Sequence, residues 1–333
     1  MKTLTLSTHY PRTILHCIQD QKGLCAEFLS DAQISPSVIN DSRARVPIES
    51  HVKLYQKIAP YINDESFGYL EHPLRFGTFA IACEYAGTAE TIGRALEKIS
   101  RFYSVVTDDL KLDLQIVGKE AHFSIKLRKP ELDKVFFLVE TFLCIGFRLS
   151  SWLAGRAIPL KFCQFSYEPV ENKNEYIFLF PCEHRFAGTG PNILAFDADF
   201  LNFPVLKTAS DIRSYISRAP ADLLNKLVGS DSFTNRVYAV LSKKDCDDAQ
   251  DAKTVASELA MTEQTLRRKL RSEGSSVQKI KDSLRLDSAV FHLTEDKYTI
   301  AEISEKLNFS TPSAFSRAFK NWTGVPPEEY RNR

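Results

Sequence analysis

The side chains with the clearest potential for chemistry lie in residues 263–272, a short segment rich in arginine. The Thr262 hydroxyl is a good N-cap for a helix here, and Leu266 and Leu270, four residues apart, share its apolar side. With both leucines buried, the polar side chains point outward, where guanidinium groups can contact DNA phosphates and base edges. The candidate contact residues are Gln264, Thr265, Arg267, Arg268 and Arg271. A solvated basic face is the alternative interpretation.

A second copy of this pattern, about fifty residues later, favours DNA reading over a solvated face. Ile300, Ala301, Ile303 and Leu307 repeat the apolar positions Val255, Ala256 and Leu259 of the first copy. Thr311 and Pro312 then begin another helix, because proline at the first helical position loses no hydrogen bond. Phe315 and Phe319 form its inward pair. The outward candidates are Thr311, Ser313, Ser316, Arg317 and Lys320.

Two units of this kind predict two contacts in the major groove. Residues 277–293 carry Ile280, Leu284, Ala289, Val290 and Leu293, a pattern typical of a helix that fixes both units relative to each other. Successive major grooves on one DNA face lie about 34 Å apart, so we expect a single chain to span one turn.

The overall composition is that of a folded, water-soluble protein. The chain has 333 residues and a net charge of +1, so any nucleic-acid contact must be local. Its seven cysteines form no Cys-x-x-Cys pair, which argues against a zinc site or a disulfide framework and favours free thiols in a reducing cytosol. The N-terminal residues lack the apolar stretch of a signal peptide, and no run approaches a membrane span, so we expect a cytoplasmic location.

The first two hundred residues alternate between helical and strand periods, which predicts an α+β domain. Expected helices cover 11–29, 50–62, 88–105 and 135–153. Expected strands cover 110–117, 122–127, 162–167, 176–180 and 193–196, with a hairpin turn at 118–120. Residues 209–227 have the spacing of connecting helices, and residues 243–253 form a polar loop near a domain boundary.

The predicted organisation is therefore an effector-binding or dimerisation domain at 12–205, connecting helices at 206–232 and an all-α DNA-binding domain at 233–333. The two helix-turn-helix units occupy about 253–274 and 299–322, and the linker helix lies between them.

The segment from Ile300 to Arg331 resembles the C-terminal signature of AraC/XylS regulators. The likeness includes Leu-Asn-Phe-Ser at 307–310, Ser-Ala-Phe-Ser-Arg-Ala-Phe-Lys at 313–320 and Gly-Val-Pro-Pro at 324–327. Asn308 and Pro326 depart from the family's usual residues, but asparagine tolerates the left-handed φ that the turn requires. The resemblance implies base-reading positions at Gln264, Arg267 and Arg268, and at Pro312, Ser313 and Arg317 in the second unit.

The same resemblance implies partners and a mode of action. It implies double-stranded promoter DNA as the target, RNA polymerase as a further partner and a homodimer, in a bacterial regulator that activates transcription more often than it represses it. Repression remains the alternative.

The N-terminal segment resembles the arabinose-binding-type effector domain of this family. The residues that carry the likeness are 23–28, Phe67-Gly68, Val105 and the strand-rich stretch from Phe162 to Phe203. The label names a type of domain, and no residue indicates a sugar. Its many phenylalanines fit a hydrophobic or amphipathic effector, although each one alone is more simply explained as core. The residues that line the effector pocket stay unknown.

Two other functions fit the sequence less well than regulation. An enzyme domain fused to a DNA reader would need a nucleophile with its base or a phosphate loop, and the Gly-rich 187–191 lacks the lysine of such a loop. No spacing around His72, His122 or His184 indicates a metal, so neither enzymatic activity nor a cofactor is expected. A nonspecific architectural DNA binder is disfavoured by the near-neutral charge and the paired, capped helices.

Overall fold

The computed structural model describes residues 5–41, 44–170, 175–224, 233–242, 252–273, 275–294, 297–323 and 326–331. The chain forms two compact units, one of residues 55–232 and one that combines residues 1–54 with residues 233–333. Among the described residues, no helix has both the length and the apolar character needed to cross a membrane. The α+β N-terminal region and the all-α C-terminal region match the predicted fold class. The boundaries of the predicted effector, connecting and DNA-binding segments stay predictions.

A five-stranded sheet organises the unit of residues 55–232. Its order is β3 (Leu110–Val117), β4 (Glu120–Leu127), β7 (Asn192–Asp197), β5 (Leu160–Phe165) and β6 (Glu183–Phe186). All neighbours are antiparallel except β5 and β6. Gly118, with a φ of 62°, occupies the first central position of the two-residue turn between β3 and β4, where a type II′ turn requires a positive φ. The predicted hairpin is confirmed.

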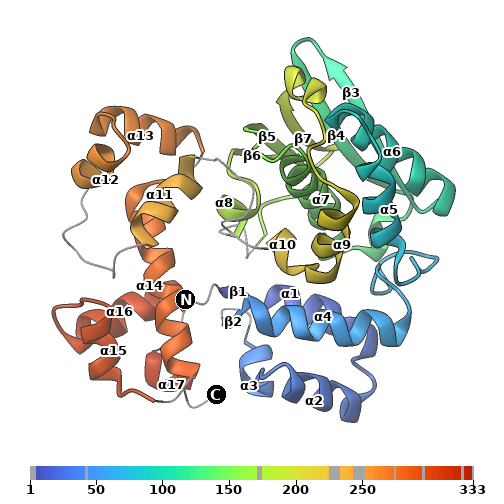
Figure 1. The fold of residues 1–333 in the computed structure, drawn as a ribbon. Coiled ribbons are helices and arrows are strands. Elements are labelled where there is room, and N and C mark those ends of the chain that lie inside the picture. The colour runs from blue at the N-terminus through green and yellow to red at the C-terminus, as the bar shows by residue number, and fades with distance from the viewer. Residues whose placement is uncertain are drawn as a thin grey trace. The chain divides into compact units, whose positions relative to one another are not determined.

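Two long helices cover one face of this sheet, α6 (Ile92–Val106) and α7 (Phe137–Leu153) (Figure 1). The apolar side chains of β3 and β4, such as Leu112 and Phe123, are buried on this face. At Gly146, α7 comes so close to the sheet that an added Cβ would lie 2.6 Å from two ring atoms of Phe123. The remaining helices of the unit are α5 (Thr78–Gly87), α8 (Tyr176–Leu179), α9 (Ala209–Arg218) and α10 (Ala221–Leu224).

The strand predicted at 176–180 is wrong, since these residues form α8. Tyr176 and Phe180 are four residues apart, and both rings pack against Phe165, with centroid distances of 4.9 Å and 5.8 Å. A short apolar run does not distinguish the strand period from the helical one. The helix predicted at 11–29 is divided into α1 (His9–Leu15), a 3₁₀ turn η1 (His16–Ile18) and α2 (Lys22–Asp31).

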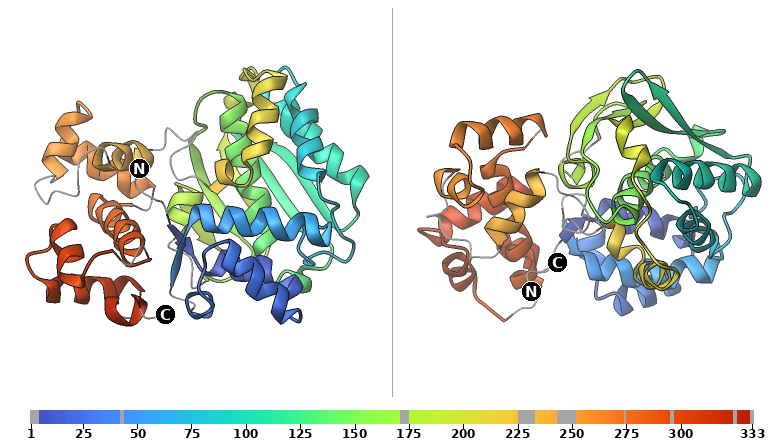
Figure 2. Two further views of the ribbon diagram at one scale, coloured as in Figure 1. Left: turned by 60° about the horizontal axis from the view of Figure 1, so that its bottom comes forward. Right: turned by 45° about the horizontal axis from the view of Figure 1, so that its top comes forward.

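The unit that combines residues 1–54 with residues 233–333 is built around α14 (Val277–Thr294). α12 (Ala252–Glu258) and α13 (Glu263–Ser272) lie at one end of it, and α15 (Ile300–Lys306) and α16 (Pro312–Thr323) lie at the other (Figures 1 and 2). α11 (Phe233–Ser242) and α17 (Pro327–Arg331) complete the helical part. The apolar positions predicted for the linker helix are buried, namely Ile280, Leu284, Ala289, Val290 and Leu293.

The start of the chain belongs to this same unit. β1 (Thr5–Ser7) pairs antiparallel with β2 (Arg45–Pro47), and α3 (Pro36–Ile39) and the beginning of α4 (Ile48–Ile62) accompany them. The backbone N–H of Thr5 donates to the buried Asp287 carboxylate of α14 at 3.1 Å. The backbone N–H of Arg45 donates to the Tyr330 hydroxyl at 3.0 Å, and that hydroxyl donates to the Arg45 carbonyl at 2.6 Å. The two short strands are thereby attached to α14 and α17.

Candidate nucleic-acid interface

The first helix-turn-helix unit has the local structure predicted from its sequence. The Thr262 hydroxyl accepts the backbone N–H of Thr265 at 3.2 Å and so caps α13. Leu266 and Leu270 are buried, as are Val255 and Ala256 of α12. Because the apolar side of α13 faces the core, its opposite side is presented to solvent.

The predicted contact residues of α13 all lie on this accessible side. Gln264, Arg267, Arg268 and Arg271 are exposed, and Thr265 is half-buried. The Arg267 guanidinium is paired with the Glu263 carboxylate one turn earlier, at 2.5 Å. Within the described residues, Arg268 has no acidic partner, so its guanidinium is available to an outside ligand without breaking an ion pair.

A hollow of about 820 Å³ lies beside α13, between this helix and the start of α14. Four of the predicted residues line it, together with Ser275, Ser276, Gln278 and Lys281. The Ser276 hydroxyl accepts the backbone N–H of Lys279 at 3.2 Å. The partial positive charge of the helix N-terminus therefore adds to that of the basic side chains. The sequence reasoning missed Gln278 and Lys281. Their signal was a position in the first two turns of a helix that starts directly after α13.

The helices of the second helix-turn-helix unit are capped more completely than those of the first. Thr299 and Glu302 form a reciprocal capping box at the start of α15. Asn308 has a φ of 55°, as expected for the asparagine in the turn, and the Thr311 hydroxyl accepts the backbone N–H of Ala314 at 3.1 Å. Phe315 and Phe319 are fully buried, as predicted. The predicted apolar stripe of α15 is only partly right, because Ala301 is exposed.

The predicted contact residues of α16 are also accessible. Thr311, Ser313, Arg317 and Lys320 are exposed, and Ser316 is half-buried. A shallower hollow of about 590 Å³ lies at the turn between α15 and α16 and is lined by Ser304, Asn308, Ser310 and Thr311 among others. No lysine or arginine lines this second hollow. The two units therefore differ in local charge.

Buried contacts fix the two units to the rest of the helical domain. Glu273, at the end of α13, accepts the backbone N–H groups of Phe233 at 2.8 Å and Thr234 at 2.7 Å, at the start of α11. Burial raises the pKa of the Glu273 carboxyl, which its hydrogen bonds partly offset. Arg285 of α14 lies over the Phe309 ring of the second unit at 5.1 Å. The two helix-turn-helix units are thus held by a common framework.

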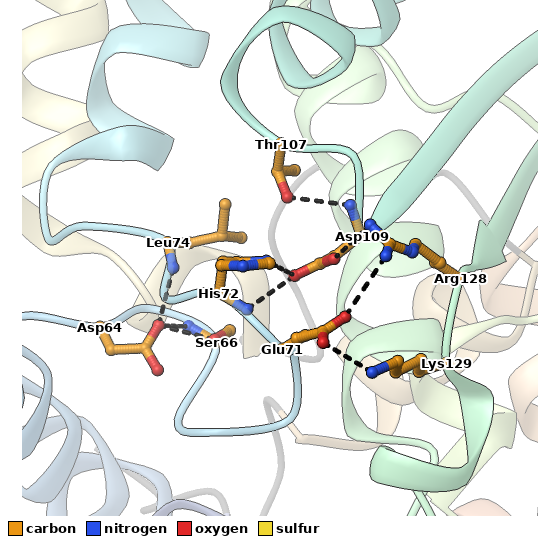
Figure 3. A network of polar contacts seen from close by, with 9 residues as sticks. All are labelled: Asp64, Ser66, Glu71, His72, Leu74, Thr107, Asp109, Arg128 and Lys129. Atoms are coloured by element: carbon orange, nitrogen blue, oxygen red, sulfur yellow. Dashed lines mark hydrogen bonds and ion pairs between the residues drawn. The ribbon is translucent and has the colours of Figure 1, made fainter.

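The unit of residues 55–232 contains a cluster with metal-ligand residue types, drawn in Figure 3. Glu71, His72 and Asp109 bring their ligand atoms within 4.8 Å of one another. Glu71 already pairs with Lys129 at 2.6 Å and Arg128 at 3.7 Å, and Arg128 also lies 3.8 Å from Asp109. These two cations neutralise the carboxylates, so we interpret the cluster as a structural ion-pair network that ties the 63–77 loop to β3 and β4.

Comparison with known proteins gives a match for the N-terminal region and another for the C-terminal region. Residues 24–205 match the family model for the arabinose-binding domain of AraC transcription regulators, and residues 255–333 match a helix-turn-helix domain model. The ornithine utilization regulator of Pseudomonas aeruginosa is 23% identical over 325 residues, which cover 97% of this chain and 95% of that protein. The regulator VirS of Mycobacterium tuberculosis is 21% identical over 310 residues, covering 91% and 89% of the two chains.

Among solved structures, the transcriptional regulator CdpR from Pseudomonas aeruginosa matches 92% of this chain and 96% of its own, with 22% identity and a TM-score of 0.35. The effector-domain match alone spans more than half of this sequence, and the capped helix pairs supply the DNA-binding part. The chain belongs to the AraC family of DNA-binding transcription regulators.

Proposed function

We propose that α13 and α16 are the two recognition helices and that they contact promoter DNA through the residues predicted above. The observation that carries this proposal is the accessibility of those side chains on two capped helices whose apolar sides are buried. Exposed guanidinium, amide and hydroxyl groups at such positions can hydrogen-bond to base edges and phosphates. The residues are Gln264, Thr265, Arg267, Arg268, Arg271, Thr311, Ser313, Ser316, Arg317 and Lys320.

The two helices have unequal tasks in this proposal. Arg268 supplies direct base readout, because its exposed guanidinium has no acidic partner within the described residues. Arg267 must first leave Glu263, 2.5 Å away, and so contributes less net binding free energy. α16 begins with Pro312, which has no backbone donor, and contributes mainly phosphate contacts through Ser313 and Arg317.

The test is footprinting and gel-shift titration of the full chain on its own upstream DNA, over a range of salt concentrations. Arg268→Ala should cost about 1–3 kcal/mol at one base position and relax specificity there. Arg213→Ala, an exposed arginine of α9, is the matched control and should change nothing. A uniform loss across all sequences would assign Arg268 to phosphate contact. Absence of sequence-dependent binding by the wild-type chain would overturn the proposal.

We further propose that residues 24–205 bind a small-molecule effector and that the chain activates transcription through RNA polymerase, as a homodimer and without enzymatic activity. Its DNA target places it in the bacterial cytoplasm. The unit of residues 55–232 supports effector binding, because it holds ionisable groups inside an aromatic core. The Glu140 carboxylate of α7 is 3% exposed and accepts the Tyr176 hydroxyl at 2.5 Å. Small-molecule sites combine apolar and aromatic side chains with a few polar groups of this kind.

A thermal-shift screen of the full chain against metabolites, ornithine included, tests the effector. A true effector raises the melting temperature with concentration and changes the affinity for DNA in the same assay. A compound that raises the melting temperature without changing DNA affinity does not qualify. A screen in which no compound does both would count against control by a small molecule.

A further inference from the structure

The outer strand of the sheet has an unused side. β3 is the edge strand next to β4, with which it forms eight consecutive pairs from Leu110↔Leu127 to Val117↔Glu120 without a bulge. Within the residues that the structure describes, no strand pairs with its other side.

The direction of the free backbone groups follows from the hairpin. Val117 and Glu120 close a two-residue turn, so they exchange both backbone hydrogen bonds. Pairs that exchange both backbone hydrogen bonds alternate with pairs that exchange none along an antiparallel ladder. Asp113 and Lys111 therefore also point their backbone groups toward β4. The N–H and C=O groups that point toward the open edge belong to Leu110, Leu112, Leu114 and Ile116.

This edge lacks most of the features that normally block pairing with another strand. Edge strands are usually short, bulged, or interrupted by proline and several lysines. β3 has eight residues, no proline, no bulge and one lysine, Lys111. Ile116 and Val117 at its end are 65% and 52% exposed.

We propose that β3 pairs antiparallel with β3 of a second copy of this chain, with the two-fold axis at Leu112. This register places Lys111 of each copy directly opposite Asp113 of the other. The pair falls at a position without mutual backbone hydrogen bonds, where facing side chains come closest. Within its own chain Lys111 faces another lysine, Lys126. The second copy supplies the carboxylate that this lysine pair lacks.

The register about Leu112 is also favoured over its neighbours. When two strands run antiparallel about Leu112, residues 110–114 of each copy lie opposite one another, and all of them belong to β3. A register centred on Asp113 would instead oppose two aspartates, and one centred on Leu114 would oppose Lys111 to Val117. A symmetric, self-complementary patch of this kind fits a homodimer.

Sedimentation velocity of the full chain over a concentration series is the test. The wild type should dimerise, and Lys111→Asp or Asp113→Lys alone should weaken dimerisation by about tenfold or more, because two attractive pairs become two repulsive ones. The double variant K111D/D113K should recover dimerisation, since it restores opposite charges. Lys22→Asp, at an exposed lysine of α2, makes the same charge change away from the sheet and should have no effect.

Two results would overturn the proposal. One is a wild-type chain that stays monomeric at all concentrations. The other is a dimer that both single variants leave intact, or that the double variant fails to restore. Lys111 is exposed and Asp113 is half-buried, so near-UV circular dichroism should confirm native folding of each variant. The DNA footprint is measured separately, so failure here does not affect the assignment of α13 and α16.

Discussion

We expect Asp133 to make the stability of the unit of residues 55–232 dependent on pH. Its carboxylate caps the start of α7, where it accepts the backbone N–H groups of Phe137 at 2.8 Å and Leu138 at 3.0 Å. The residue is 1% exposed, and burial raises the pKa of its carboxyl to about 6 despite these hydrogen bonds. An unfolded aspartate has a pKa of about 3.9. The folded state therefore binds this proton more tightly than the unfolded state.

The sign and size of the effect follow from linkage. Stability from this group is fully present below pH 4 and is lost as the pH rises through 6, because the folded state holds more protons in that range. A shift of about 2 pKa units corresponds to about 3 kcal/mol in total. At pH 5 the folded carboxyl is mostly protonated while the unfolded one is mostly ionised. We therefore expect the free energy of unfolding to fall by about 1 kcal/mol between pH 5 and pH 7.

Urea denaturation of the full chain at pH 5, 6 and 7, followed by circular dichroism, measures this effect. Residue 133 cannot titrate in the Asp133→Asn variant. The free energy of unfolding of the wild type should therefore fall by about 1 kcal/mol relative to that of the variant between pH 5 and pH 7. Asp199→Asn, at an exposed aspartate, should leave the pH dependence of the wild type unchanged. If the wild-type and Asp133→Asn curves run parallel across this range, the carboxyl is already ionised in the folded state and the reasoning is refuted.

Three further substitutions test the packing and the caps, each by urea denaturation of the full chain. Gly146→Ala should destabilise by about 1–3 kcal/mol, because its Cβ would collide with the Phe123 ring, whereas Gly23→Ala meets no atom within 4 Å and should not destabilise. Thr299→Ala removes the capping box of α15 and should cost about 1 kcal/mol. Asn308→Val should cost about 1–2 kcal/mol, since a β-branched residue resists a φ of 55°, while Asn308→Gly should be neutral or stabilising.

The sequence predicted best which face of a helix is buried. Leu266, Leu270, Phe315 and Phe319 repeat at helical spacing, and the structure buries all four. The caps at Thr262 and Thr299 are local, so a few residues determine them. These signals need no knowledge of the rest of the chain.

Prediction failed where distant residues decide the structure. β1 and β2 have three residues each, too few for a visible period, and they exist because they pair with each other across forty residues. Glu273 caps α11 from another helix, and Glu71 meets Asp109 from a separate loop. Gln278 and Lys281 join the basic hollow only through the way α14 follows α13. Such contacts have no local pattern in the sequence.

The attachment of Thr5 to Asp287 has a consequence for the order in which the chain folds. Asp287 follows Thr5 by 282 residues, so β1 and β2 are synthesised long before the carboxylate that binds the N–H of Thr5. Contacts that close so long a loop form slowly and late. Until then Asp287 lacks the N–H of Thr5, and Tyr330 lacks the backbone groups of Arg45. The unit of residues 1–54 and 233–333 is therefore complete only after the segment up to Tyr330 has been made.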